Sequence, residues 1–212
     1  MLYNDERFIQ FAKPYLKDCS NVFIAHHLNL VARTFFRRTR IYRPAFTPIN
    51  VVANQAGYTV TAPAGYEVTA LLEVNFEGAE IKPRTRAEAK RHFGQSWETD
   101  TAHSAEVYVQ TDEGALTLVP IPDRSIAAGL TGTCALQPTL LATGIPDAIF
   151  NKYGLYIAYG ALADLMSMSK KPWSSQDAVK YAVLYQNHEN ETRDKVERDF
   201  GERDLIASGN LW

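Results

Sequence analysis

The residue types that most often do chemistry are sparse in this chain and follow no recognised pattern. Its five histidines and two cysteines show none of the spacings by which proteins hold a metal ion. The sequence has no glycine-rich phosphate loop, no dinucleotide fingerprint and no hydrolase serine motif. Asp100 and His103 would need a distant serine for acyl transfer, which any chain of this length supplies. We therefore expect no catalytic residue, no metal site and no cofactor.

The two cysteines, Cys19 and Cys134, lie far apart in the sequence. Free cysteine is among the most buried residue types, so we expect two reduced thiols in the core. No apolar run reaches the roughly 18 residues that a membrane-spanning helix needs. The first residues also lack the basic segment and apolar stretch of a secretory signal. These features predict no membrane partner.

Arginines crowd the end of one predicted helix. The helix is expected from a cap at Ser20 or Asn21 to about residue 40. Its last turns carry Arg33, Arg37, Arg38 and Arg40. Positive charge there complements the helix dipole, and a solvated or subunit-interface face is favoured over a nucleic-acid site. Trp173 follows Lys170-Lys171-Pro172, is expected to pack locally, and is a further subunit-interface candidate.

A short apolar segment follows Gly201. It contains Leu205, Ile206, Leu211 and Trp212. Chain ends are often disordered, but a buried tryptophan removes about 150–250 Å² of surface from water. We therefore expect residues 201–212 to anchor the protein on a partner.

These candidates must be positioned by helices at both ends of the chain. Apolar side chains recur at helical spacing in residues 5–17 and about 21–40. A third helix is predicted to start at Gly144-Ile145-Pro146-Asp147 and to run to about residue 168. Gly154 and Gly160 within it indicate close approach by a neighbouring element.

A fourth helix is predicted from a capping box at Ser174 and Asp177 to about Phe200. The short turn before it predicts an antiparallel helix hairpin. Its outer part should stay helical through acid–base pairs four residues apart. These pairs are Glu189 with Arg193, Glu191 with Lys195, and Asp194 with Arg198.

Between residues 47 and 143 the pattern changes to short strands. They are predicted at 67–76, 79–82, 105–110, 115–119 and 129–137. Thr85 and Glu88 form a capping box for one short helix that ends near Phe93. The predicted fold class is α+β: an α-helical bundle, made of an N-terminal helix pair and a C-terminal helix hairpin, with an inserted small antiparallel β-domain. The predicted boundaries are 1–46, 47–143, 144–200 and a tail of 201–212.

Charge is unevenly distributed although the net charge is only −2. Residues 1–46 hold eight Lys and Arg against three Asp and Glu, whereas residues 47–145 hold six against eleven. A protein that is basic overall and binds nucleic acid is disfavoured. The asymmetry favours subunits that pack beside one another with opposite charges in contact.

The order of these parts resembles the head-to-tail adaptor proteins of tailed bacteriophages, of the podophage tail tubular protein A type. The resemblance covers about residues 5–200. It is carried by Phe35-Phe36-Arg37-Arg38-Thr39-Arg40, Leu118-Val119-Pro120-Ile121-Pro122, Leu136-Gln137-Pro138, Ile145-Pro146-Asp147, Tyr159-Gly160-Ala161-Leu162 and Met168-Ser169-Lys170-Lys171-Pro172-Trp173-Ser174.

The resemblance implies a structural virion protein without enzymatic activity, made in the host bacterial cytoplasm. Such adaptors form a homo-oligomeric ring, typically a dodecamer, under the portal protein. They connect it to the tail nozzle protein and let DNA pass through a channel without sequence specificity. Leu205, Ile206, Leu211 and Trp212 would then bind the portal. The alternatives are a neck or tail-completion protein of a long-tailed phage and a small hydrolase.

Overall fold

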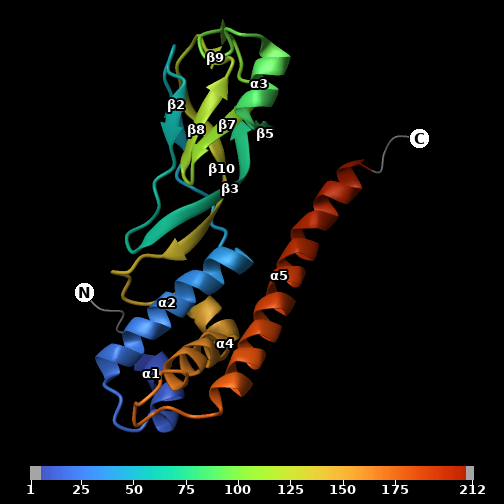
Figure 1. Ribbon diagram of the computed structural model, residues 1–212. Coiled ribbons are helices and arrows are strands. Elements are labelled where there is room, and N and C mark those ends of the chain that lie inside the picture. Colours follow the sequence, from blue (N-terminus) through green and yellow to red (C-terminus); the bar gives the residue numbers. More distant parts are fainter. Residues whose placement is uncertain (1–5, 209–212) are drawn as a thin grey trace. The chain divides into compact units, whose positions relative to one another are not determined.

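The structure is a computed structural model that describes residues 6–208, with side chains described from residue 6 to residue 199. It is a mixed α and β protein, as the sequence predicts. The chain forms two compact units (Figure 1). The helical unit contains the residues up to Tyr42, residues 64–66 and the residues from Gln137 onward. The strand unit contains residues 43–63 and 67–136.

The helical unit is built from helices of both chain ends. They are α1 (Glu6–Ala12), the short 3₁₀ helix η1 (Lys13–Tyr15), α2 (Asn21–Thr39), α4 (Asp147–Met166) and α5 (Ala178–Ser208). The N-terminus of α2 is capped as predicted, because the Ser20 hydroxyl accepts a hydrogen bond from the Phe23 amide at 3.3 Å. Arg40 ends α2 in the left-handed conformation, and its amide donates to the Phe36 carbonyl.

The ends of the hairpin helices differ from the prediction. Pro146 is the N-cap of α4, one position before the expected place. The capping box predicted at Ser174 is wrong, because α5 begins at Ala178 and the Ser175 hydroxyl accepts from the Asp177 amide. The helix also continues past Phe200 to Ser208. A lone glycine costs a helix only about 1 kcal/mol, so Gly201 does not end it.

The core of the helical unit lies where α1 and α2 meet α4. Its fully buried large side chains include Phe8, Leu28, Phe35 and Leu165. Phe150 of α4 packs edge-on against Phe8, with ring centroids 4.7 Å apart. This core joins residues that are more than a hundred positions apart in the sequence, so neither chain end can complete it alone.

Gly160 marks the closest crossing of helices. A methyl group placed there would lie 2.6 Å from Val31 Cγ1 of α2 and 2.8 Å from Tyr185 Cδ2 of α5. The prediction of close approach is therefore confirmed at Gly160. It is wrong at Gly154, where the added methyl group would meet the Phe150 ring of the same helix at 3.0 Å.

The strand unit contains two four-stranded sheets and one pair of short strands. One sheet has the order β1 (Ile49–Val51), β10 (Ile126–Pro138), β3 (Tyr66–Phe76) and β4 (Ala79–Glu80). The other has the order β2 (Gly57–Thr59), β8 (Ala115–Val119), β7 (Val107–Asp112) and β5 (Lys82–Arg84). The pair consists of β6 (Thr101–Ala102) and β9 (Ile121–Pro122).

The prediction of a purely antiparallel β-domain is wrong. β5 pairs with β7 in parallel, and β6 also pairs with β9 in parallel. A parallel pair needs a crossover between its strands, and α3 (Arg86–Phe93) lies in the connection from β5 to β7. The Thr85–Glu88 capping box of α3 is present as predicted. The helix that the sequence placed among the strands thus permits the parallel pairing.

A small cluster holds α3 against its sheet. Ala89 of α3 is fully buried with Trp97, Val107, Val109 and Val119, and Phe93 packs at the edge of this cluster.

The two predicted buried thiols are confirmed, since Cys19 and Cys134 are buried and free. Among the described residues, no helix is long and apolar enough to cross a membrane.

Replacing Gly160 by alanine should destabilise the helical unit. The added methyl group overpacks a crossing of three helices, which costs about 1–3 kcal/mol and exceeds the roughly 1 kcal/mol gained in helix propensity. Urea unfolding of Gly160→Ala and of the control Gly154→Ala measures the difference. Gly154→Ala should cost less, because its methyl group would meet one side chain of the same helix at 3.0 Å rather than two neighbouring helices. Equal stability of the two variants would contradict the close crossing.

Candidate protein interface

An open groove lies between α2, α4 and α5 on the helical unit. Its volume is about 600 Å³, within the range of about 300–1,000 Å³ that ligand pockets span. Gly160 and Ala163 of α4 are on its lining, together with Leu30 and Val31 of α2 and Ala182 of α5. Small residues of α4 thus leave room between the two flanking helices.

The flanks of the groove expose apolar side chains. Leu30 is 37% exposed, and Val179 is 72% exposed. Val183, one turn after Val179 on α5, is 52% exposed. Scattered apolar residues are normal on a surface, but Leu30 and Val179 line one concave region, which is typical of surfaces that bind other proteins.

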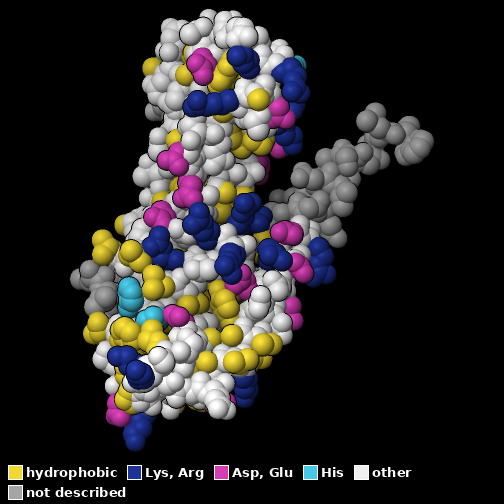
Figure 2. All heavy atoms as spheres, viewed as in Figure 1, with side chains coloured by type: hydrophobic (Ala, Val, Ile, Leu, Met, Phe, Trp, Pro, Cys, Tyr) yellow, Lys and Arg dark blue, Asp and Glu magenta, His cyan; other side chains and the backbone are white. Residues whose placement is uncertain are grey.

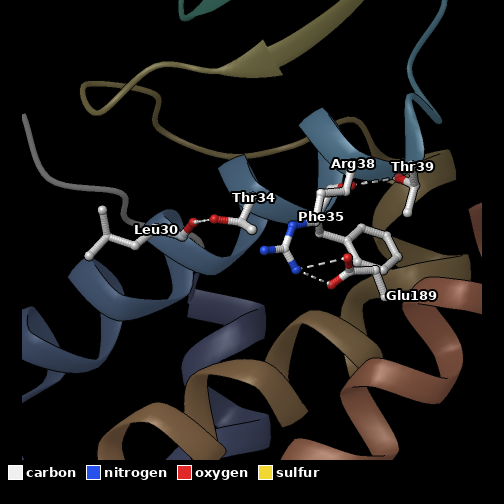
Figure 3. Close-up of polar contacts among 6 residues, drawn as sticks. All are labelled: Leu30, Thr34, Phe35, Arg38, Thr39 and Glu189. Carbon is white, nitrogen blue, oxygen red and sulfur yellow. Dashed lines mark hydrogen bonds and ion pairs between the residues drawn. The ribbon is translucent and has the colours of Figure 1, made fainter.

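One part of the groove is lined by an ion pair between α2 and α5. Figure 3 shows Arg38 reaching from α2 toward Glu189 of α5, and the guanidinium Nη1 lies 3.1 Å and 3.4 Å from the two carboxylate oxygens. The Glu189 side chain is only 7% exposed, whereas that of Arg38 is 62% exposed. The buried carboxylate of Glu189 is therefore paired with a cation, Arg38, that still faces solvent.

Tyr185 lies one turn before Glu189 on the same lining. Burial raises the pKa of the Tyr185 hydroxyl, and the nearby Glu189 carboxylate raises it further. The raised pKa keeps this hydroxyl neutral in the folded protein at pH values where an unfolded chain would lose its proton. The groove thus holds one buried negative charge, on Glu189, and a neutral phenol beside it.

A second polar pair lies along the same face. His27 Nδ1 of α2 is paired with Asp164 of α4, and Asp164 also lines the groove. The His27 ring is mostly buried and packs against the Phe23 ring, with centroids 4.7 Å apart. These contacts tie α2 to α4, as Arg38 ties α2 to α5.

The other interface candidates from the sequence lie on the same unit. Of the three arginines of α2 and the Arg40 that caps it, Arg38 lines the groove, Arg37 and Arg40 are exposed, and Arg33 is half-buried. Trp173 packs against the helical core, with its ring 6.1 Å from that of Phe23. Its predicted local packing is confirmed, and its role between subunits stays a prediction.

The predicted anchor falls mostly beyond the described side chains. Leu205 and Ile206 lie in the last turns of α5, in a segment of which only the backbone is described. Leu211 and Trp212 lie outside the described residues. Their proposed role therefore stays a prediction.

The residues considered for catalysis have other partners. Ser96 Oγ donates a hydrogen bond to Asp100 at 3.0 Å, and His103 Nδ1 lies 3.5 Å from Asp123. Asp100 and His103 are therefore each engaged elsewhere in the strand unit. In the part of the chain that the structure describes, no group of three or more His, Cys, Asp or Glu could hold a metal ion.

The role of Glu189 was missed by the sequence pattern. The expected exposed pair with Arg193 is wrong, because Glu189 is buried and bonds Arg38. A signal was present in the spacing of the buried face of α5. Tyr181, Glu189 and Val196 are all buried and follow one another at helical intervals, so Glu189 lies on the packed stripe.

Replacing Arg38 by alanine should destabilise the protein more than replacing Glu189 by glutamine. Arg38→Ala leaves a buried carboxylate without its cation, which costs about 1–3 kcal/mol, whereas Glu189→Gln removes the charge. Urea unfolding at neutral pH measures both effects, with Lys195→Ala, which removes an exposed cation of α5, as control. An Arg38→Ala variant as stable as this control would argue against the pair.

Comparison with protein families gives a match that covers nearly the whole chain. The model of the SU10 adaptor protein family matches residues 5–204. A search of curated proteins finds no match. The family is a phage structural adaptor, so the protein is a virion component that contacts other parts of the head–tail junction. On the extent of this match, the chain belongs to the SU10 adaptor protein family.

Proposed function

We propose that the protein forms a ring that connects the phage portal to the tail nozzle around the DNA channel. The observation that carries this proposal is the family match over residues 5–204. In this role the protein acts by geometry rather than by catalysis. The proposed ring is homo-oligomeric, a dodecamer. Such a ring needs one patch on each subunit that fits a different patch on the next copy.

The groove of the helical unit supports a role for that unit in protein contacts. It offers exposed apolar side chains at Leu30 and Val179, next to Arg38, which is exposed and paired with the buried Glu189. Interfaces are commonly built from an apolar centre with a polar rim, and arginine is enriched in them. We place Arg33, Arg37, Arg38, Arg40 and Trp173 at contacts between subunits of the ring.

The proposed arrangement assigns the two units different tasks. The helices form the bundle that closes the ring, and residues 47–143 act as an inserted domain toward the tail nozzle. Residues 201–212 grip the portal through Leu205, Ile206, Leu211 and Trp212. DNA passes through the ring without sequence readout. This arrangement is of the podophage tail tubular protein A type, with the subunits made in the host cytoplasm before they join the virion.

Ring formation is expected to depend on the portal. The mass of the purified protein, measured in solution alone and then with portal rings, tests this. We expect a monomer alone and a closed ring on the portal, because segments that order on docking gain their contacts only there. A protein that remains monomeric with portal rings would contradict the adaptor role. A ring that forms on a tail tube instead of the portal would favour a neck or tail-completion protein.

Removal of the anchor should abolish docking without unfolding the subunit. We expect a variant that lacks residues 205–212 to keep the urea unfolding midpoint of the full chain, because the described core ends before them. Co-sedimentation with portal rings measures docking. The control Val52→Ser removes an exposed apolar side chain of the strand unit and should dock normally. Normal docking of the truncated protein would show that the anchor lies elsewhere.

A further inference from the structure

Four exposed cations gather at one edge of the strand unit. Arg84 ends β5, and Arg86, Lys90 and Arg91 project from α3, which follows it directly. All four residues are exposed. Figure 2 shows Lys and Arg side chains along the side of the strand unit that carries α3. We call these four residues the basic edge.

The basic edge stands out against the charge of its own unit. The strand unit contains seven Lys and Arg and eleven Asp and Glu. Four of the seven basic residues lie within residues 84–91, which leaves three for the rest of the unit. A concentration of one charge in an oppositely charged unit is not explained by overall composition.

The chain does little to neutralise these cations. Glu88 is the one acid within residues 84–91, and its carboxylate accepts hydrogen bonds from the Thr85 amide at 2.8 Å and hydroxyl at 2.9 Å. These bonds lower the pKa of Glu88, with a smaller contribution from the charges of Arg84 and Arg91. Arg86 and Lys90 form no ion pair with any residue that the structure describes. They also stand four residues apart on one helix, a spacing at which like charges repel.

The helix that presents the basic edge is firmly held. The capping box fixes its first turn, and Ala89 is buried against the sheet. β5, which carries Arg84, is the edge strand of its sheet and pairs with β7 from Lys82 to Arg84. The four cations are thus carried on ordered backbone, which lowers the entropic cost of binding a ligand.

The surroundings of the basic edge favour nucleic acid over an acidic protein. Protein interfaces depend on apolar or aromatic anchors near their centre. No large apolar side chain is exposed between residues 82 and 92. Contacts to a phosphate backbone need only cations and polar groups. We propose that the basic edge binds the phosphate backbone of double-stranded DNA without reading its sequence.

This binding does not depend on the ring, because each subunit carries its own basic edge. With four phosphate contacts, log K should fall with log salt concentration with a slope of about −3 to −4. Fluorescence anisotropy of a labelled duplex of mixed sequence, titrated with protein at several NaCl concentrations, measures this slope. The full chain is used throughout, and a second duplex of different sequence should bind equally well.

The decisive variant carries Arg86→Gln, Lys90→Gln and Arg91→Gln. It should bind DNA about 10²-fold more weakly at low salt, with the slope reduced by about three. The matched control Lys17→Gln, Lys180→Gln, Lys195→Gln removes three exposed cations of the helical unit and should bind as the unmodified protein does. The charge-conserving variant Arg86→Lys, Lys90→Arg, Arg91→Lys should also retain binding, and it separates loss of charge from loss of fold.

Three results would overturn the proposal. The first is a salt slope near zero for the unmodified protein. The second is equal weakening in the Gln variant and in the helical-unit control. The third is displacement of the DNA by polyglutamate at an equal concentration of charge, which would assign the basic edge to an acidic polypeptide.

Discussion

The helical unit depends on one position where a side chain would not fit. At Gly160, α4 comes so near to α2 and α5 that Val31 and Tyr185 occupy the space a methyl group would need. The consequences extend along both neighbours. Because α2 and α5 both pack closely on α4, Arg38 can reach Glu189. The small residues of α4 near the crossing leave space for the groove between the two flanking helices. Interhelical distance, ion pair and groove are therefore parts of one packing arrangement.

Local sequence signals predicted the local features well. The caps at Ser20 and Thr85 depend on residues within three positions, and both are present. Features that depend on distant partners were harder to predict. Glu189 has Arg193 four residues away, yet its partner is Arg38, which is 151 positions distant. Gly154 and Gly160 look alike in sequence, and only the path of α2 and α5 distinguishes them.

The same distinction applies to the strands. The long strands β3 and β10 have clear patterns, and the sequence located both. β1, β2, β6 and β9 have only two or three residues each, too few to show alternation, and they form because longer strands already offer hydrogen-bonding partners. Parallel pairing of β5 with β7 could not be predicted from either strand alone, because it depends on where α3 places the chain. Of the subunit-interface candidates predicted from the sequence, Arg38 alone lines the groove of the helical unit.

The order of the two units along the chain has a consequence for synthesis on the ribosome. α1 and α2 emerge first, but the helix that covers their apolar faces, α4, begins only at Asp147. At a synthesis rate of about 5–20 residues per second, α4 is made on the order of ten seconds after α2. Nearly all of the strand unit emerges in that interval as a continuous stretch with its own core, so it can fold first. Nascent chains therefore expose the apolar face of α2 for seconds before α4 is available to cover it.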